Sequence, residues 1–164
     1  MAQTNQKYEL LDHDTVTTPS GLVLKRIRAL VAIDSLVAAG ELGGYIESED
    51  NLAWGGNAWV SDNAWVSGNA WVSDNALVYG NALVSGNAWV EKRTDLFWIS
   101  IIGSENGTYT AFKNKDGGIL VNRGCFSGTL EEFTDAVNKR HEGKFNQEYQ
   151  LVIELTKLRL GQQV

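Results

Sequence analysis

Six consecutive units of six residues constrain the fold of this chain more than any other sequence feature. The stretch 57–92 reads NAWVSD NAWVSG NAWVSD NALVYG NALVSG NAWVEK. Every unit begins with Asn-Ala and carries Val at its fourth position. An α-helix, with its 3.6-residue turn, does not repeat every six residues, and an ordinary hairpin has no reason to. The repeat therefore predicts a structure built from short, regularly spaced segments.

The order of residues within a unit predicts one short strand followed by one corner. Ala and Val are two positions apart, so in an extended segment they face the same side, and the residue between them faces the other. The pairs Asp-Asn and Gly-Asn that follow suit a tight turn, because these residues tolerate positive φ. We expect Ala and Val to point inward, and Trp or Leu to point outward.

The segment 60–65, Val-Ser-Asp-Asn-Ala-Trp, recurs in constant phase and resembles the hexapeptide-repeat family. That family has an aliphatic residue, usually a small residue four positions later, and turns between them. The resemblance implies a left-handed parallel β-helix, a triangular prism with about three hexads per turn. The expected fold class is therefore mainly β, a short left-handed parallel β-helix with a small C-terminal α+β cap. The resemblance is specific for fold and says little about function.

An 18-residue turn sets a register that coordinates can test. Inside, it stacks Val60 on Val78, and at the corners it stacks Asn57 on Asn75, where side-chain amides could form a hydrogen-bonded ladder. On the outside, the expected stacks are Trp59 with Leu77, Trp65 with Leu83, and Trp71 with Trp89.

We divide the chain into three parts. Residues 1–34 form an N-terminal strand or arm, residues 35–92 form the β-helix with its regular coils at 57–92, and residues 93–164 form the α+β cap with two helices. Two short segments before the repeat, Ser35-Leu36-Val37 and Gly44-Tyr45-Ile46, keep the small-x-aliphatic pattern and predict a degraded coil. Trp54 is too large for an inward position, so a bulge or loop is expected there.

The flanking segments predict ordinary elements. Residues 21–33 are expected as a strand, and residues 96–102, 108–113 and 119–121 as an antiparallel meander, with turn signals between them.

Two helices are expected after the meander. Thr129 and Glu132 form a capping box at the start of the first, and Gly143 ends it. The second spans about 146–160 and buries Tyr149, Val152, Ile153, Thr156 and Leu160, although a strand remains an alternative for part of it.

Two further runs, 123–133 and 40–48, look like segments of uncharacterised bacteriophage and prophage hexapeptide-repeat proteins. Together with the repeat, this resemblance spans nearly the whole chain. It implies a viral accessory protein that acts inside a bacterium, in the host cytoplasm. It implies no activity.

Many hexapeptide-repeat proteins are acyltransferases, and that resemblance implies a trimer, an acyl-carrier cofactor and a catalytic histidine. The only histidines of this chain, His13 and His141, lie outside the repeat. We expect a structural role for His141 near a helix C-terminus and a solvated position for His13 beside Asp12. Cys125 could be a nucleophile but has no histidine near it in sequence. We therefore expect no catalytic residue, no metal site and no cofactor, and favour a non-enzymatic protein.

The outward side chains of the repeat are the predicted binding surface. A large exposed set of indoles is unusual, so something must cover at least one face. The chain's own termini, a second copy of the chain and a foreign partner are the three alternatives. The predicted binding residues are Trp59, Trp65, Trp71, Trp89, Leu77 and Leu83.

Charge and composition exclude several functions. The net charge is −6, and the repeat has no basic residue before Lys92, which disfavours direct nucleic-acid binding. No apolar run approaches the length of about 20 residues that a membrane helix needs. The N-terminus lacks the basic start and apolar run of a signal peptide, so a cytoplasmic location is expected.

The sequence thus predicts a homo-oligomeric, non-enzymatic phage accessory protein. Its expected task is to bind and inhibit a host protein, such as a defence component, or to sequester a small signal between subunits. Two alternatives stay open, an acyl- or sugar-nucleotide transferase of the hexapeptide class and a structural component of the virion.

Overall fold

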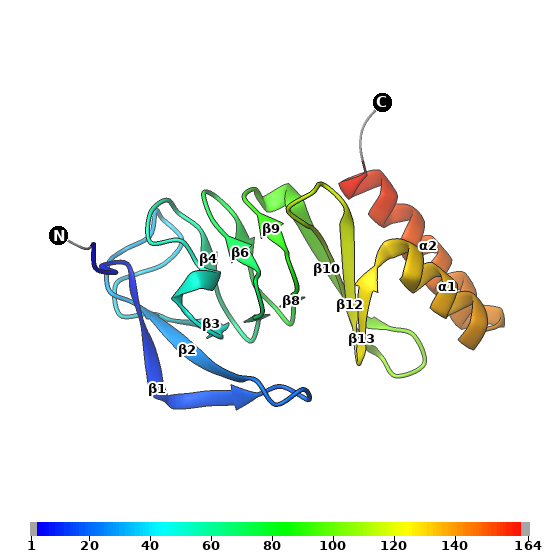
Figure 1. Ribbon diagram of the computed structural model, residues 1–164, viewed down its shortest axis with the longest axis horizontal. Coiled ribbons are helices and arrows are strands. Elements are labelled where there is room, and N and C mark those ends of the chain that lie inside the picture. The colour runs from blue at the N-terminus through cyan, green and yellow to red at the C-terminus, as the bar shows by residue number, and fades with distance from the viewer. Residues whose placement is uncertain (1–2, 162–164) are drawn as a thin grey trace.

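A computed structural model describes residues 3–161 and shows a mainly β protein with two helices at its C-terminal end (Figure 1). Along the longest axis, an N-terminal hairpin is followed by the repeat, then by an antiparallel sheet, and then by the helices. The strands form four small sheets, of which one is mixed and one is purely antiparallel.

The hexads pair in parallel at a separation of 18 residues, as the sequence predicts. Trp59 lies opposite Leu77, Trp65 opposite Leu83, and Trp71 opposite Trp89. The alanines and valines of the six units point inward and are at most 1% exposed. The strands are β4 (Trp59–Val60), β5 (Trp65–Val66), β6 (Trp71–Val72), β7 (Leu77–Val78), β8 (Leu83–Val84) and β9 (Trp89–Val90).

The expected fold class, a short left-handed parallel β-helix with a small C-terminal α+β cap, is nevertheless wrong. The two-residue strands of the repeat lie in three separate sheets, and two of these sheets contain a single pair, β4–β7 and β6–β9. The third contains β5 and β8 but continues into antiparallel strands before the repeat. The physical reason is the small number of units, because six hexads give each strand only one regular partner.

The sixth position of the hexad forms the corner and adopts a positive φ. In the first five units this position is Asp or Gly, with φ of 56° at Asp62 and 64° at Gly68, whereas Lys92 in the last unit has φ of −122°. Stacked corners need glycine on at least one side, since a Cβ at Gly56 would lie 2.9 Å from the Asp74 carbonyl oxygen. Within residues 3–161 no hydrogen bond joins the stacked asparagine side chains, so the expected amide ladder is wrong. Instead, the Asn57 backbone N–H donates to the Asp74 carbonyl at 2.7 Å.

The segment before the repeat forms one imperfect layer. Strand β3 (Leu42–Ile46) places Tyr45 opposite Trp65, an offset of 20 residues. The additional length is taken up near Trp54, which is 39% exposed in an irregular segment, as expected from its size. The prediction of a coil at Ser35–Val37 is wrong, because the Ile33 N–H bonds the Val37 carbonyl and closes a local turn.

The N-terminal hairpin consists of β1 (Tyr8–Thr17) and β2 (Val23–Ala29), and β2 pairs antiparallel with β3. The strand expected over 21–33 is therefore present but shorter. Its partner β1 lies within the N-terminal strand or arm predicted over residues 1–34, but the sequence sets no bounds for it. The hairpin tip extends alongside the repeat toward the C-terminal sheet (Figure 1).

The C-terminal sheet confirms the predicted meander and adds one strand. Its order is β10 (Leu96–Ile102), β11 (Gly107–Lys113), β12 (Ile119–Arg123) and β13 (Phe126–Thr129), all antiparallel. One face packs Phe112 against the repeat, and the other packs Tyr109 and Ala111 against the helices. This sheet therefore separates two apolar cores.

Both predicted helices are present, α1 (Leu130–Arg140) and α2 (Gly143–Leu160). Thr129 Oγ1 accepts from the Glu132 N–H at 3.1 Å, which is half of the expected capping box. Gly143, expected to end the first helix, begins the second with φ of 62°. The five residues expected to be buried on the second helix are all buried.

Side chains of the C-terminal sheet complete the hydrogen bonding at the end of the repeat. The Leu83 N–H donates to Thr110 Oγ1 at 3.1 Å, and Asn122 Nδ2 donates to the Leu83 carbonyl at 2.8 Å. These backbone groups of β8 would otherwise need a further strand, because buried polar groups without partners are costly. The repeat can therefore end here without exposing the ladder.

A buried lysine near the N-terminus makes the free energy of unfolding depend on pH. Lys7 is 5% exposed, and its Nζ donates to the Ala53 carbonyl at 3.1 Å. Burial lowers the pKa of this ammonium from 10.5 to about 8. The folded protein therefore releases this proton at a lower pH than the unfolded chain does.

We predict that raising the pH from 8 to about 10.5 stabilises the protein through Lys7. In this window the unfolded state binds more protons, so the free energy of unfolding gains up to about 3 kcal/mol from this group. Below pH 8 both states are protonated and the gain is absent. Denaturant unfolding across this range should show a smaller rise with pH for Lys7→Met. Identical pH profiles would contradict the prediction.

Candidate functional site

The six predicted binding residues lie in three different environments. Trp59 is buried, Trp89 is 36% exposed, and the other four are half-buried. The structure does not bring all six into one surface, because their strands belong to three separate sheets. Each parallel pair has to be considered by itself.

The Trp59 face is covered by the chain's own N-terminal part. The Tyr8 ring packs edge-on to Trp59 with 6.4 Å between ring centroids, and the Tyr8 hydroxyl donates to the Leu52 carbonyl at 2.7 Å. Gly43 packs just as closely, since a Cβ there would lie 2.8 Å from Trp59 Cζ2. Trp59 is therefore a core residue and offers no surface to a partner.

Trp71 and Trp89 form a second, partly exposed pair, with 6.2 Å between ring centroids. Trp89 Nε1 donates to Glu91 Oε1 at 3.0 Å, and the Lys115 ammonium lies 5.7 Å from the Trp89 ring centroid. The indoles are thus held by local polar contacts.

Trp65 and Leu83 line a groove of about 380 Å³. One wall is the tip of the β1–β2 hairpin, with Pro19 and Leu22. The opposite wall is the turn between β12 and β13, where Cys125 and Phe126 lie. Three segments that are far apart in sequence therefore form one hollow, and two of the predicted binding residues line it.

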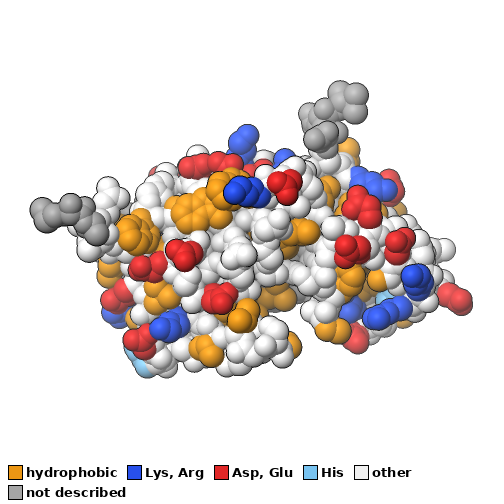
Figure 2. All heavy atoms as spheres, viewed as in Figure 1, with side chains coloured by type: hydrophobic (Ala, Val, Ile, Leu, Met, Phe, Trp, Pro, Cys, Tyr) orange, Lys and Arg blue, Asp and Glu red, His pale blue; other side chains and the backbone are white. Residues whose placement is uncertain are grey.

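The groove is uncharged. None of its lining residues is Asp, Glu, Lys, Arg or His. Its polar groups are serine and threonine hydroxyls, backbone groups and Asn122, whose Nδ2 is already bonded to the Leu83 carbonyl and to Ser85 Oγ. Figure 2 shows acidic and basic side chains spread over the face that it draws, with apolar side chains between them. An apolar occupant without formal charge fits this hollow best.

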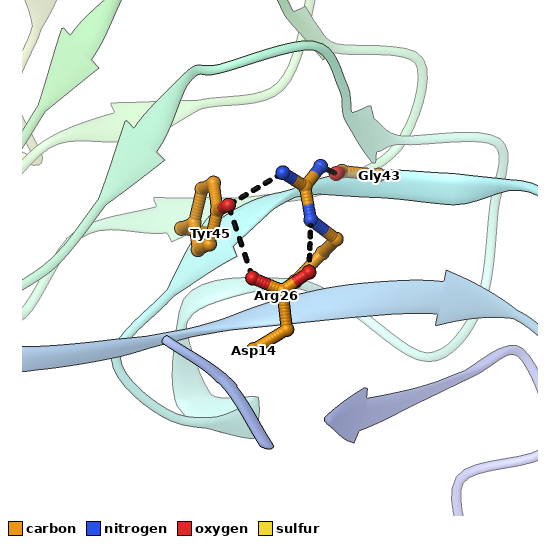
Figure 3. A network of polar contacts seen from close by, with 4 residues as sticks. All are labelled: Asp14, Arg26, Gly43 and Tyr45. Carbon is orange, nitrogen blue, oxygen red and sulfur yellow. Dashed lines mark hydrogen bonds and ion pairs between the residues drawn. The ribbon is translucent and has the colours of Figure 1, made fainter. Parts of the chain in front are cut away.

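A partly buried polar network holds the hairpin that forms the first wall (Figure 3). Arg26 Nε donates to Asp14 Oδ2 at 2.8 Å, and its Nη1 donates to the Gly43 carbonyl at 2.8 Å. The Tyr45 hydroxyl accepts from Arg26 Nη2 and donates to Asp14 Oδ1 at 3.2 Å. Because these residues lie on β1, β2 and β3, the network fixes the hairpin to the layer that carries Trp65.

Of the residues considered for catalysis, His13 lies apart, whereas Cys125 and His141 line one cavity. His13 is exposed on β1, and the His141 ring packs against Tyr149 at 5.2 Å between centroids. Cys125 is exposed and also borders a second cavity of about 250 Å³, together with Arg123, His141 and Tyr149. Among residues 3–161, no three His, Cys, Asp or Glu side chains gather in a way that could hold a metal ion.

The second cavity contains buried polar atoms that lack partners. Arg123 Nε and Nη2 and the Tyr149 hydroxyl are enclosed without a hydrogen bond to any described residue. Burial raises the pKa of the Tyr149 hydroxyl, and the nearby Arg123 guanidinium opposes this increase. Because these atoms are enclosed, a ligand in the cavity would not contact them.

Sequence reasoning identified the floor of the groove but missed its walls. The residues Pro19, Ser20 and Gly21 are typical of a turn, and the structure has one there, yet nothing in the sequence places that turn beside Trp65. Asn122 was not singled out at all. Its only signal is the polar residue inside an apolar run, Ile119-Leu120-Val121-Asn122, which marks a strand position facing a polar acceptor.

Comparison with known proteins provides no family for this chain. None of the protein families, curated proteins or solved structures that were compared matches it. No helix in the described part of the chain is long and apolar enough to cross a membrane. The candidate site is therefore defined by its own geometry alone.

Proposed function

We propose that this chain is a non-enzymatic binding protein that takes an apolar segment of a partner protein into the Trp65–Leu83 groove. The observation that carries the proposal is a hollow lined by an indole, leucines and a phenylalanine without a single charged side chain. The phage resemblance stated above supports a host protein as the partner. Inhibition would then follow from occupying the partner's own exposed segment.

A partner protein is favoured over a small phosphorylated signal. Phosphate groups need cations or arrays of free backbone N–H groups, and the groove supplies no cation. The same feature disfavours nucleic acid, whose affinity depends on basic residues that contact phosphates. Aromatic and aliphatic anchors are what protein interfaces bury at their centres.

The transferase alternative predicts a different site. It requires a histidine as general base near a channel for an acyl carrier, whereas His13 and His141 lie outside the groove. Micromolar binding of an acyl-coenzyme A in calorimetry would support the transferase and contradict our proposal. For the virion alternative, mass spectrometry of purified particles decides, because a structural component is present in them and an intracellular inhibitor is not.

Cys125, the only cysteine of the chain, provides a direct test because it is exposed in the groove wall. We predict that the protein labelled at Cys125 with a benzophenone maleimide cross-links a bacterial protein on irradiation in lysate. Leu22→Asp places a charge in the opposite wall and should lower the yield about tenfold, because burying an unpaired carboxylate opposes binding.

Leu36→Asp is the matched control, since Leu36 is also an exposed leucine but lies outside the groove. It should leave cross-linking unchanged. Equal yields for wild type and Leu22→Asp, with both proteins folded by circular dichroism, would rule out the groove as the binding site.

A further inference from the structure

Helix α2 has a second apolar face, on the side away from the core that it forms with the C-terminal sheet. Leu151 is 72% exposed, Leu155 39% and Leu158 77%. Their spacing of four and then three residues places all three on one stripe of the helix. The buried face of the same helix carries Tyr149, Ile153 and Leu160 instead. The helix is therefore apolar on two sides, and only one of them is covered.

The edge strand β10 extends this stripe. Ile101 is 78% exposed, and Ile99 is 38% exposed. With Leu151 and Leu155 these residues line a hollow of about 320 Å³. We call Ile99, Ile101, Leu151, Leu155 and Leu158 the α2–β10 surface.

The backbone at Ile101 is strained in a way that keeps this side chain outside. Its φ is 62°, in the left-handed region that β-branched residues rarely adopt. The pairing of β10 with β11 shifts register between Ser100 and Ile102, so Ile101 is the additional residue of a bulge. The additional residue leaves Ile101 exposed, while Ile102, which follows it, is buried in the core under the helices. Such outliers are typical of sites where another molecule binds.

Charges border the surface in a self-complementary order. Glu148 lies toward the N-terminal end of the stripe, and Arg159 lies toward its C-terminal end, on the same flank of the helix. Arg159 forms no ion pair with any described residue. Glu154, on the other flank, is already paired with Lys157 at 3.6 Å.

We propose that the α2–β10 surface binds a second copy of this chain, with the two α2 helices antiparallel about a twofold axis near Leu155. In that arrangement Leu151 of one copy packs on the partner's Leu158. Glu148 comes within about one helical turn of the partner's Arg159, and the symmetry forms this pair twice. A parallel pair would leave Glu148 and the partner's Arg159 at opposite ends of the contact, about 16 Å apart along the helix axis. The twofold axis also brings the two Glu154 side chains close, where the local pairing with Lys157 limits their repulsion.

The charge of the C-terminal part permits this association. Residues 91–164 carry 10 acidic and 10 basic residues, so the C-terminal parts of two copies do not repel each other through net charge. The negative charge of the chain lies in the remaining parts. The proposed contact does not involve the groove. It places the expected homo-oligomer contact on α2 and not on the outward tryptophans of the repeat.

Sedimentation of the full chain over a range of concentrations tests the proposal. We expect dimers with a dissociation constant on the order of micromolar. Leu151→Gln combined with Leu158→Gln should raise this constant at least tenfold, because both leucines lose their apolar contact. Leu36→Gln, an exposed leucine elsewhere, should leave it unchanged. A wild-type protein that stays monomeric up to about 100 µM overturns the proposal and leaves the surface to a foreign partner.

Charge reversal distinguishes a twofold contact from non-specific association. Glu148→Arg alone and Arg159→Glu alone should each weaken the dimer severalfold, and the double variant should restore it. Ile101→Asn should weaken the dimer while raising the thermal midpoint of the monomer, since Asn tolerates the left-handed backbone. Failure of the double variant to restore association, with each protein folded, contradicts the antiparallel arrangement. None of these residues lines the groove, so its cross-linking test is unaffected.

Discussion

The structure depends on one constraint, the close stacking of small and branched side chains at an interval of 18 residues. Alanine and valine occupy every inward position of the six hexads, and all are buried. Each two-residue strand forms few hydrogen bonds. The parallel pairs are stable because the corner geometry and the buried side chains of the units favour the same register. A left-handed corner that only Gly or Asp occupies fixes the direction of each following strand. The outward indoles are positioned as a consequence of this inward packing.

The sequence predicts the interior of the repeat well because one residue type recurs at each position. Register, inward alanines and valines, the loop near Trp54 and the buried face of α2 all follow from periodicity. The fold class does not follow. Periodicity describes neighbouring units, whereas the class depends on how many units stack and on what completes each sheet. Here β3 pairs in parallel with β5, and the hairpin then continues the same sheet in antiparallel fashion. The sequence does not predict strand β13, and it wrongly predicts amide bonds between corner asparagines, for a similar reason, since both depend on contacts outside the unit.

The candidate groove shows the same division. Trp65 and Leu83 are identifiable from the repeat, but their environment is set by long-range contacts. The Arg26 network attaches the hairpin to β3, and Thr110 and Asn122 bring the C-terminal sheet against β8. Neither contact has a sequence pattern, because each joins single residues across distant segments. The Trp59–Leu77 and Trp71–Trp89 pairs show why exposure cannot be inferred from outward direction alone. Trp59 is buried by Tyr8, whereas Trp89 is 36% exposed.

Disulfide trapping tests the 18-residue register most directly. In a Cys125→Ser background, Ser67→Cys and Ser85→Cys lie in the positions that follow the Val66–Val84 pair. Adjacent strands are about 4.8 Å apart, within reach of a disulfide. The account predicts rapid oxidation of this pair, an intact fold, and a bond that peptide mapping assigns to one chain. It predicts no intramolecular bond for Ser61→Cys with Ser85→Cys, which are offset by 24 residues. Equal oxidation of the two pairs, or bonding of the second pair alone, would contradict it.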